Sequence, residues 1–461
     1  MNFDDIVYLV CLISCIYFGN FYRKIKDSEQ QKVVGTALGV LILFIVSGFH
    51  ILHSFISFGL CATAITLCST KKVHIIAFCI MFGYLVFFRT VHYFNLPAVP
   101  GHTNMIQMIL TLKMVGVAFE KNQSFLKMKQ RDQGSTEVEI TDYDVEIQSI
   151  SFVELFHYAF NYIGVLTGPF YRYRTFRDYF ETPFKEFSKP LENTIEKLKG
   201  CALYASCYLV FSYIWPIDYA MSSEFYDDRI WIYRLFYVWP SFIIFRMRIY
   251  TGLTLSEAVC TNAGFGAYPN ESEVANGEGP KTQYLQFKRS PEKHDYNFKT
   301  IQNIDVYNTE TCYTFREAMK TWNICVQYWL AVNIYKRFPS KKYRTAVTLL
   351  VSSFWHGFQP GHYMCIMGAP FYVPVEDMLN KAIRKDATGV KRKVIDVIFW
   401  INKFFAFSYL AMAFLLLTMD KIWHYYSSVY HYGYVWYLVL LVTGISLLKM
   451  RKKERRGEKK E

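Results

Sequence analysis

Two polar residues in apolar surroundings are the strongest candidates for catalysis. His356 ends an apolar run within the segment Ser352–His362, and Asn323 lies upstream in a run that we predict to be an apolar helix. They are 33 residues apart, which is enough for two helices and a turn, so the sequence allows their side chains to face each other. An ionisable side chain at membrane depth costs several kcal/mol, and such a residue is therefore a functional candidate.

These residue types suit acyl transfer from a thioester to an alcohol. The hydroxyl proton must leave as the oxygen attacks, and a neutral imidazole in a dry site is a suitable base at cytosolic pH. The amide group of Asn323 can donate a hydrogen bond to the resulting oxyanion, or orient the imidazole. Ser352 and Cys365 are weak candidates for a nucleophile, so no acyl-enzyme is expected. On these residues alone, a histidine that serves only packing is an equally good interpretation.

Other familiar catalytic patterns are missing from the sequence. It contains no GxSxG, P-loop, HExxH or DHHC motif, and none of its 11 histidines is followed by Asp at the fifth position. The 11 cysteines are scattered, mostly within apolar runs, without a CxxC pair. We therefore expect neither a metal site nor a resident cofactor.

The pattern of hydrophobicity predicts an all-α, polytopic membrane protein. The chain has 461 residues, of which 52% are hydrophobic and 18% aromatic. Several apolar runs approach the roughly 20 residues that a membrane span needs, and in lipid such runs must be helices. The clearest are Ile6–Phe21, Val73–Phe88, Tyr204–Ile217, Ile230–Ile249, Phe404–Thr418 and Tyr432–Leu448. The net charge of +13 sits at the ends of these runs, as in Arg23–Lys26, which indicates cytosolic span ends and argues against nucleic-acid binding.

The order of these runs predicts about 11 crossings with an outside N-terminus and a cytosolic C-terminus. Phe152–Leu166 and Trp322–Tyr335 have basic residues on both sides, so we interpret the first as re-entrant or interfacial and the second as re-entrant. We expect a loop at Gln130–Ile147 and an ordered, functional polar segment at Ala263–Thr314. We predict a single membrane-embedded domain, residues 1–461, with a catalytic core at approximately 152–373 and a basic cytosolic tail at 449–461.

Three stretches around the two candidates carry a family resemblance. They are Tyr313-x-Phe315-Arg316-x-x-Met319-x-x-Trp322-Asn323, then Trp329-Leu330-x-x-x-Ile334-Tyr335-Lys336-Arg337, then Phe354-Trp355-His356-Gly357-x-x-Pro360-Gly361. Together they closely resemble the membrane-bound O-acyltransferase family, and within it the lysophospholipid acyltransferase branch. The run Leu166-Thr167-Gly168-Pro169-Phe170-Tyr171-Arg172-Tyr173-Arg174 makes the chain most similar to lysophosphatidylinositol acyltransferases.

This resemblance implies a helical fold around a central tunnel, with Asn323 and His356 matching the family's paired Asn and His. It implies that acyl-CoA enters from the cytosol as co-substrate and that the sn-2 hydroxyl of lysophosphatidylinositol is re-acylated. The chains transferred are expected to be polyunsaturated, such as arachidonoyl, and the location is expected to be the endoplasmic reticulum. Alternatives are a choline, ethanolamine or serine head group, a family member that acylates a secreted protein, or a polytopic transporter.

Further residues are candidates for substrate binding. Arg172 and Arg174 can meet phosphates of CoA or of the lipid, although anchoring at the membrane interface explains them equally well. Lys320 is open to the same two interpretations. The remaining candidates are aromatic or basic residues of the motifs, namely Arg316, Trp322, Trp355 and His362. For His362, a structural role is the main alternative.

Overall fold

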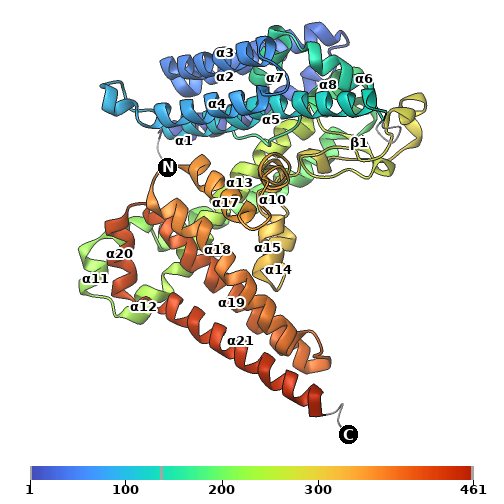
Figure 1. The fold of residues 1–461 in the computed structure, drawn as a ribbon. Helices are drawn as coiled ribbons and strands as arrows, with labels where there is room; N and C mark the ends of the chain where they lie inside the picture. Colours follow the sequence, from blue (N-terminus) through green and yellow to red (C-terminus); the bar gives the residue numbers. More distant parts are fainter. Residues whose placement is uncertain (1–2, 135–138, 458–461) are drawn as a thin grey trace. The chain divides into compact units, whose positions relative to one another are not determined.

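The computed structural model describes residues 3–134 and 139–457, and in this part of the chain nearly all regular structure is helical. Its two short strands, β1 (Tyr268–Pro269) and β2 (Tyr296–Asn297), form one antiparallel pair. The prediction of an all-α fold is therefore confirmed. The chain divides into two compact units (Figure 1), and the single domain with its core at about 152–373 stays a prediction.

Unit 1 comprises residues 1–202, 251–304 and 323–339. Its long helices α2 to α5 pack in chain order, with α3 against α4 and α4 against α5 (Figure 1). The helices of this unit are α1 (Phe3–Tyr22), α2 (Ser28–Ser47), α3 (Ile51–Leu67), α4 (Val73–Arg89), α5 (Gly101–Asp132), α6 (Asp142–Glu146), α7 (Phe152–Phe160), α8 (Tyr173–Glu181), α9 (Phe184–Phe187) and α16 (Ile324–Leu330), and a π-helical turn (Ala331–Tyr335) follows α16.

Unit 2 comprises residues 203–250, 305–322 and 340–461. Its centre is α18, which packs against α17, α19 and α21. The helices of this unit are α11 (Ser223–Asp227), α12 (Trp231–Phe236), α14 (Val306–Thr311), α15 (Phe315–Thr321), α17 (Arg344–His356), α18 (Pro360–Leu379), α19 (Gly389–Leu416), α20 (Met419–Ser428) and α21 (Tyr432–Gly457). The boundary between the units falls within α10 (Pro190–Ile214) and α13 (Val238–Asn262).

Four helical stretches of residues 3–134 and 139–457 are long and apolar enough to cross a membrane, judged by length and composition. They are Phe3–Tyr22, Ser28–Leu67, Gly389–Leu416 and Tyr432–Lys453. The second is interrupted at Gly48, whose φ of 53° ends α2 before α3 begins. The predicted total of about 11 crossings stays a prediction.

The two segments interpreted as re-entrant are short in the structure. α7 has 9 residues, which at 1.5 Å per residue is about 14 Å and less than half of a bilayer core. α16 and the π-helical turn after it together span only Ile324–Tyr335. Neither helix is long enough to cross a membrane by itself, in agreement with the sequence interpretation.

Two polar stretches are more helical than predicted. In Gln130–Ile147, α5 continues to Asp132 and α6 forms, because Thr141 and Asp144 make a reciprocal capping box; residues 135–138 of that stretch lie outside the described part. One helix, α10, contains most of the predicted apolar run Tyr204–Ile217 and also the charged residues before it. The segment 263–314 contains 3-10 turns and α14 as well as the two strands.

Glycines allow close helix contacts in both units. A Cβ at Gly39 of α2 would lie 1.9 Å from the carbonyl oxygen of Phe160, and Gly35 accepts a backbone hydrogen bond from Tyr162 at 2.9 Å. In unit 2, a Cβ at Gly361 of α18 would lie 2.1 Å from the carbonyl oxygen of Ala413 in α19. Small residues therefore bring backbones together here, as is common between helices in membranes.

Candidate active site

Asn323 lies at the start of α16 rather than inside a helix, which corrects the prediction from the sequence. It is the N-cap residue, with φ 49° and ψ 50°, and its side chain makes no capping hydrogen bond. A left-handed conformation is uncommon for a residue other than glycine and costs about 1 kcal/mol or more. Such strain is often found at functional sites, and the half-buried Asn323 keeps its place as a candidate.

α16 is attached to α5 through Trp329. Its indole Nε1 donates to the carbonyl oxygen of Leu112 at 3.0 Å, and the side chain is fully buried. At Gly116, one turn further along α5, a Cβ would lie 3.2 Å from the ring of Phe170 and 3.4 Å from Nε1 of Trp329. Two of the motifs found in the sequence, 166–174 and 329–337, therefore meet on the same face of α5.

The loop that carries Phe170 is fixed by a buried lysine. The amine of Lys113 donates to the carbonyl oxygen of Tyr158 at 3.2 Å and to the hydroxyl of Tyr171 at 2.9 Å. Tyr171 in turn donates to the carbonyl oxygen of Ile163 at 2.6 Å, and Tyr158 donates to the carbonyl oxygen of Tyr171 at 2.7 Å. These bonds connect α5, the end of α7 and the loop before α8.

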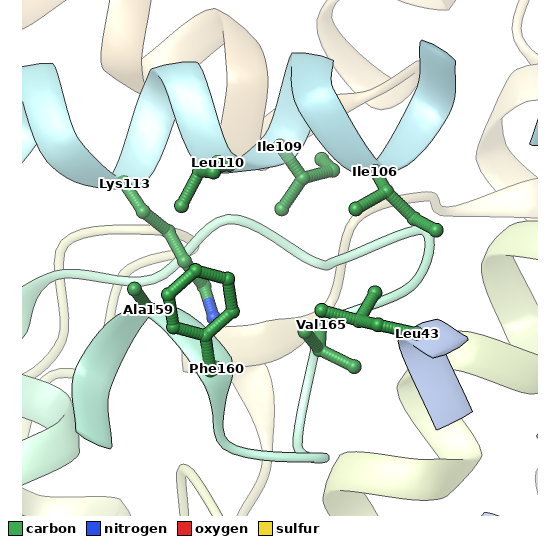
Figure 2. Close-up of a pocket in the computed structure, with 8 residues that line it drawn as sticks. All are labelled: Leu43, Ile106, Ile109, Leu110, Lys113, Ala159, Phe160 and Val165. Carbon is green, nitrogen blue, oxygen red and sulfur yellow. The ribbon is translucent and has the colours of Figure 1, made fainter. Parts of the chain in front are cut away.

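Figure 2 shows the pocket beside this lysine, between α5 and the segment from Ala159 to Val165. The lining is apolar apart from Lys113, and the space is too narrow to hold a water molecule. We therefore interpret it as a packing defect of unit 1 and not as a substrate site. Its lining residues are Leu43, Ile106, Ile109, Leu110, Lys113, Ala159, Phe160 and Val165.

Arg172 and Arg174 both have partners within unit 1. Arg172 forms an ion pair with the buried carboxylate of Glu120, with 3.2 Å between Nε and Oε2. Burial alone would lower the pKa of this guanidinium, but the Glu120 carboxylate outweighs burial and the pKa of Arg172 is raised. Arg174 donates from Nη2 to the carbonyl oxygen of Pro280 at 2.7 Å and lies over the ring of Tyr284. Phosphate binding by these two residues stays a prediction.

A buried carboxylate ties the polar segment 263–304 to α8. Asp178 accepts hydrogen bonds from the hydroxyls of Tyr268 and Tyr284, each at 2.7 Å. Burial raises the pKa of Asp178, although Arg174 and the two tyrosines act in the opposite direction. The same segment reaches α16, because a Cβ at Gly277, whose φ is 71°, would lie 3.0 Å from Tyr328. These contacts connect the segment to α8 and to α16.

In unit 2, His356 is the last residue of α17, as predicted, and lies among aromatic rings. Its ring centroid is 4.8 Å from that of the buried Trp355 and 5.4 Å from that of Phe414. His362 lies nearby, 6.2 Å from His356 and 4.7 Å from Phe414. A Cβ at Gly357 would lie 2.6 Å from the ring of His362, so the glycine leaves space for that imidazole.

The other predicted binding residues of unit 2 lie on or beside α15. Arg316 forms an exposed ion pair with Asp377 at 2.5 Å, and Lys320 is exposed. Trp322 packs between the rings of Phe242, at 6.5 Å, and Tyr250, at 5.5 Å. The structure brings His356, Trp355 and His362 together at the end of α17 and the start of α18.

Asn323 belongs to unit 1 and His356 belongs to unit 2, and their pairing stays a prediction. The motifs did not indicate Asn303, which contacts the backbone directly after Asn323, or Glu257, which binds the backbone of Asn303. Glu257 carries a signal that sequence reasoning could have used, because it is an acidic residue between apolar stretches of α13. Asn303 lies in a polar segment and carries no such signal.

The fold and these sites define an integral membrane protein with polar candidates for catalysis placed at helix ends. Residues 95–419 match the model of the membrane-bound O-acyltransferase family. The chain belongs to the membrane-bound O-acyltransferase family, and it is an acyltransferase of the membrane.

Similar proteins cover nearly the whole chain. The membrane-bound acylglycerophosphatidylinositol O-acyltransferase frj of Drosophila melanogaster is 57% identical, over 98% of this chain and 94% of its own length. Proteins described as membrane-bound acylglycerophosphatidylinositol O-acyltransferases from Xenopus laevis and Homo sapiens are each 33% identical, over 100% and 97% of this chain and over 98% and 94% of their own lengths. The resemblance inferred from the motifs is confirmed.

Proposed function

We propose that the protein transfers an acyl chain from acyl-CoA to the sn-2 hydroxyl of lysophosphatidylinositol. The observation that carries this proposal is the 57% identity, over 98% of the chain, to a protein described as an acylglycerophosphatidylinositol O-acyltransferase. The preferred chains are polyunsaturated and the enzyme works in phospholipid remodelling. It is a multi-pass protein of the endoplasmic reticulum, with about 11 crossings and a central tunnel.

His356 is the general base of the proposed reaction. It takes the proton from the sn-2 hydroxyl as the oxygen attacks the thioester carbonyl carbon, which gives a tetrahedral oxyanion. The carbon–sulfur bond then breaks, and the imidazolium returns the proton to the CoA sulfur. Aromatic rings lie beside the half-buried His356, and the neutral form of the imidazole is the one that acts as the base.

Asn323 is the oxyanion donor or the group that orients the imidazole. Its side chain does not cap α16, so the amide is available for this task. Among the basic candidates, Arg174 and Lys320 suit a phosphate of CoA or lipid better than Arg172, because Glu120 balances the charge of Arg172. Arg316, Trp322, Trp355 and His362 line or support the substrate path in this proposal.

The test is an acyl-transfer assay in microsomes that lack competing activity. Wild type, His356→Ala and the control His424→Ala are compared with lysophospholipids of four head groups and with saturated and arachidonoyl-CoA. We expect His356→Ala to lower the rate about 10²- to 10⁴-fold, as for loss of a general base. His424, which packs on Tyr226 at 4.1 Å, should be replaceable.

Equal turnover by wild type and His356→Ala would eliminate the catalytic role of His356. A wild type that acylates only lysophosphatidylcholine would remove the inositol assignment and leave the acyltransferase class. A preference for saturated over arachidonoyl-CoA would contradict the proposed chain selectivity.

A further inference from the structure

α16 is capped by a residue from a distant part of the sequence. The first N–H groups of a helix need acceptors, and an Asn at the N-cap usually supplies one from its own side chain. Here the side chain of Asn323 does not. Instead, Asn303 accepts from Ile324 N at 2.6 Å through its carbonyl oxygen and from Cys325 N at 3.1 Å through Oδ1.

Asn303 is in turn held by a buried carboxylate of α13. Oε1 of Glu257 accepts from the backbone N–H groups of Asn303, at 2.7 Å, and Ile304, at 3.2 Å. Its other oxygen pairs with the amine of Lys197 of α10 at 2.6 Å. Glu257 is 2% exposed and Asn303 is 3% exposed. Charge-assisted hydrogen bonds from a buried, paired carboxylate are short and directional, so they define the backbone position of Asn303.

We propose that Asn303, fixed by Glu257, is a positioning residue for Asn323. This inference rests on the proposed function of Asn323 and extends it. By capping α16 in place of Asn323, Asn303 leaves the carboxamide of Asn323 for the reacting thioester. By binding the two N–H groups directly after Asn323, it also holds that residue in its left-handed conformation.

The reason such support matters is geometric. A donor to an oxyanion contributes most when it is already in place before the charge develops. A displacement of about 1 Å caused by a mutation outside the reacting groups can cost about 10²-fold in rate. Loss of the Asn303 cap would let the start of α16 relax, and we expect this to lower kcat more than substrate affinity.

The test uses the full-length purified enzyme in detergent or vesicles, with kcat expressed per folded molecule. The variants are Asn303→Ala, Asn303→Asp, Asn323→Ala and the double variant Asn303→Ala/Asn323→Ala. The matched control is Asn262→Ala, a buried Asn of α13 that donates to the carbonyl oxygen of Ile16 in α1 and accepts from Arg23, which follows α1. Asn303→Asp retains Oδ1 as an acceptor and is the conservative rescue.

We expect Asn303→Ala to lower kcat about 10- to 100-fold, with KM for both substrates changed by less than about twofold. Asn303→Asp should recover most of the loss, and Asn262→Ala should keep kcat within about twofold of wild type. If Asn303 acts through Asn323, the double variant should be no slower than Asn323→Ala alone.

The inference would be overturned if the kcat losses of the two single variants multiplied in the double variant. It would also be overturned if Asn262→Ala lost as much kcat as Asn303→Ala. A wild-type rate in Asn323→Ala would remove the proposed role of Asn323, and the positioning role would fall with it. If the enzyme acylates a lysophospholipid other than lysophosphatidylinositol, only the head-group assignment fails. In that case the kinetics of the same single and double variants, measured with that substrate, decide the role of Asn303.

Discussion

The start of α16 and the end of α17 carry the two candidate catalytic residues; buried hydrogen bonds support the first, and aromatic rings lie beside the second. Beside Asn323, hydrogen bonds connect α16 to Asn303 and from there to Glu257. Beside His356, the rings of Trp355, His362 and Phe414 lie next to the imidazole. Hydrogen bonds weaken steeply with distance and angle, whereas apolar packing is non-directional. The structural effect of a substitution should therefore extend to more residues in the first region than in the second.

The largest effect is expected from Glu257→Ala. The change removes the acceptor of two buried N–H groups and the partner of Lys197. We expect a loss of about 3–5 kcal/mol of stability, measured as a large drop of the melting temperature in detergent. Glu257→Gln, which keeps one acceptor oxygen, should lose clearly less. Equal melting temperatures for wild type and Glu257→Ala would refute the importance of this network.

A smaller effect is expected in the packing of α18, the helix that follows His356. Gly361→Ala would place a methyl group 2.1 Å from a backbone oxygen of α19, and we expect about 1–3 kcal/mol of overpacking. The matched control is Gly368→Ala, where the nearest atom, at 2.6 Å, is the end of the flexible Leu410 side chain. Thermal unfolding of both variants checks this prediction, and it fails if Gly368→Ala is the more damaging change.

The smallest effect is expected beside His356. Phe414→Leu keeps an apolar side chain against the imidazole and should cost about 1 kcal/mol of stability. Because the contact is non-directional, kcat should fall less than in Asn303→Ala. Kinetics and melting curves of the two variants, measured side by side, test the comparison directly. A larger kcat loss in Phe414→Leu would reverse it.

The sequence predicted the class of fold and the identity of the candidates better than it predicted local structure. Long apolar runs imply helices because a backbone in lipid must satisfy its own hydrogen bonds. Pro360, which belongs to the third motif, occupies the first turn of α18, where a proline is well tolerated. The sequence missed α6, since a capping box of two residues is a weak signal, and it placed Asn323 inside a helix instead of at its start.

The sequence by itself determined that this is a helical membrane acyltransferase with a His and an Asn as its chemical candidates, because hydrophobic runs and motifs are local properties of a chain. Only the tertiary structure decided that Asn303 and Glu257 hold the residue at position 323, and that Glu120 balances Arg172. These partners are separated by tens of residues in the chain. Their contacts depend on how helices pack, which no local pattern encodes.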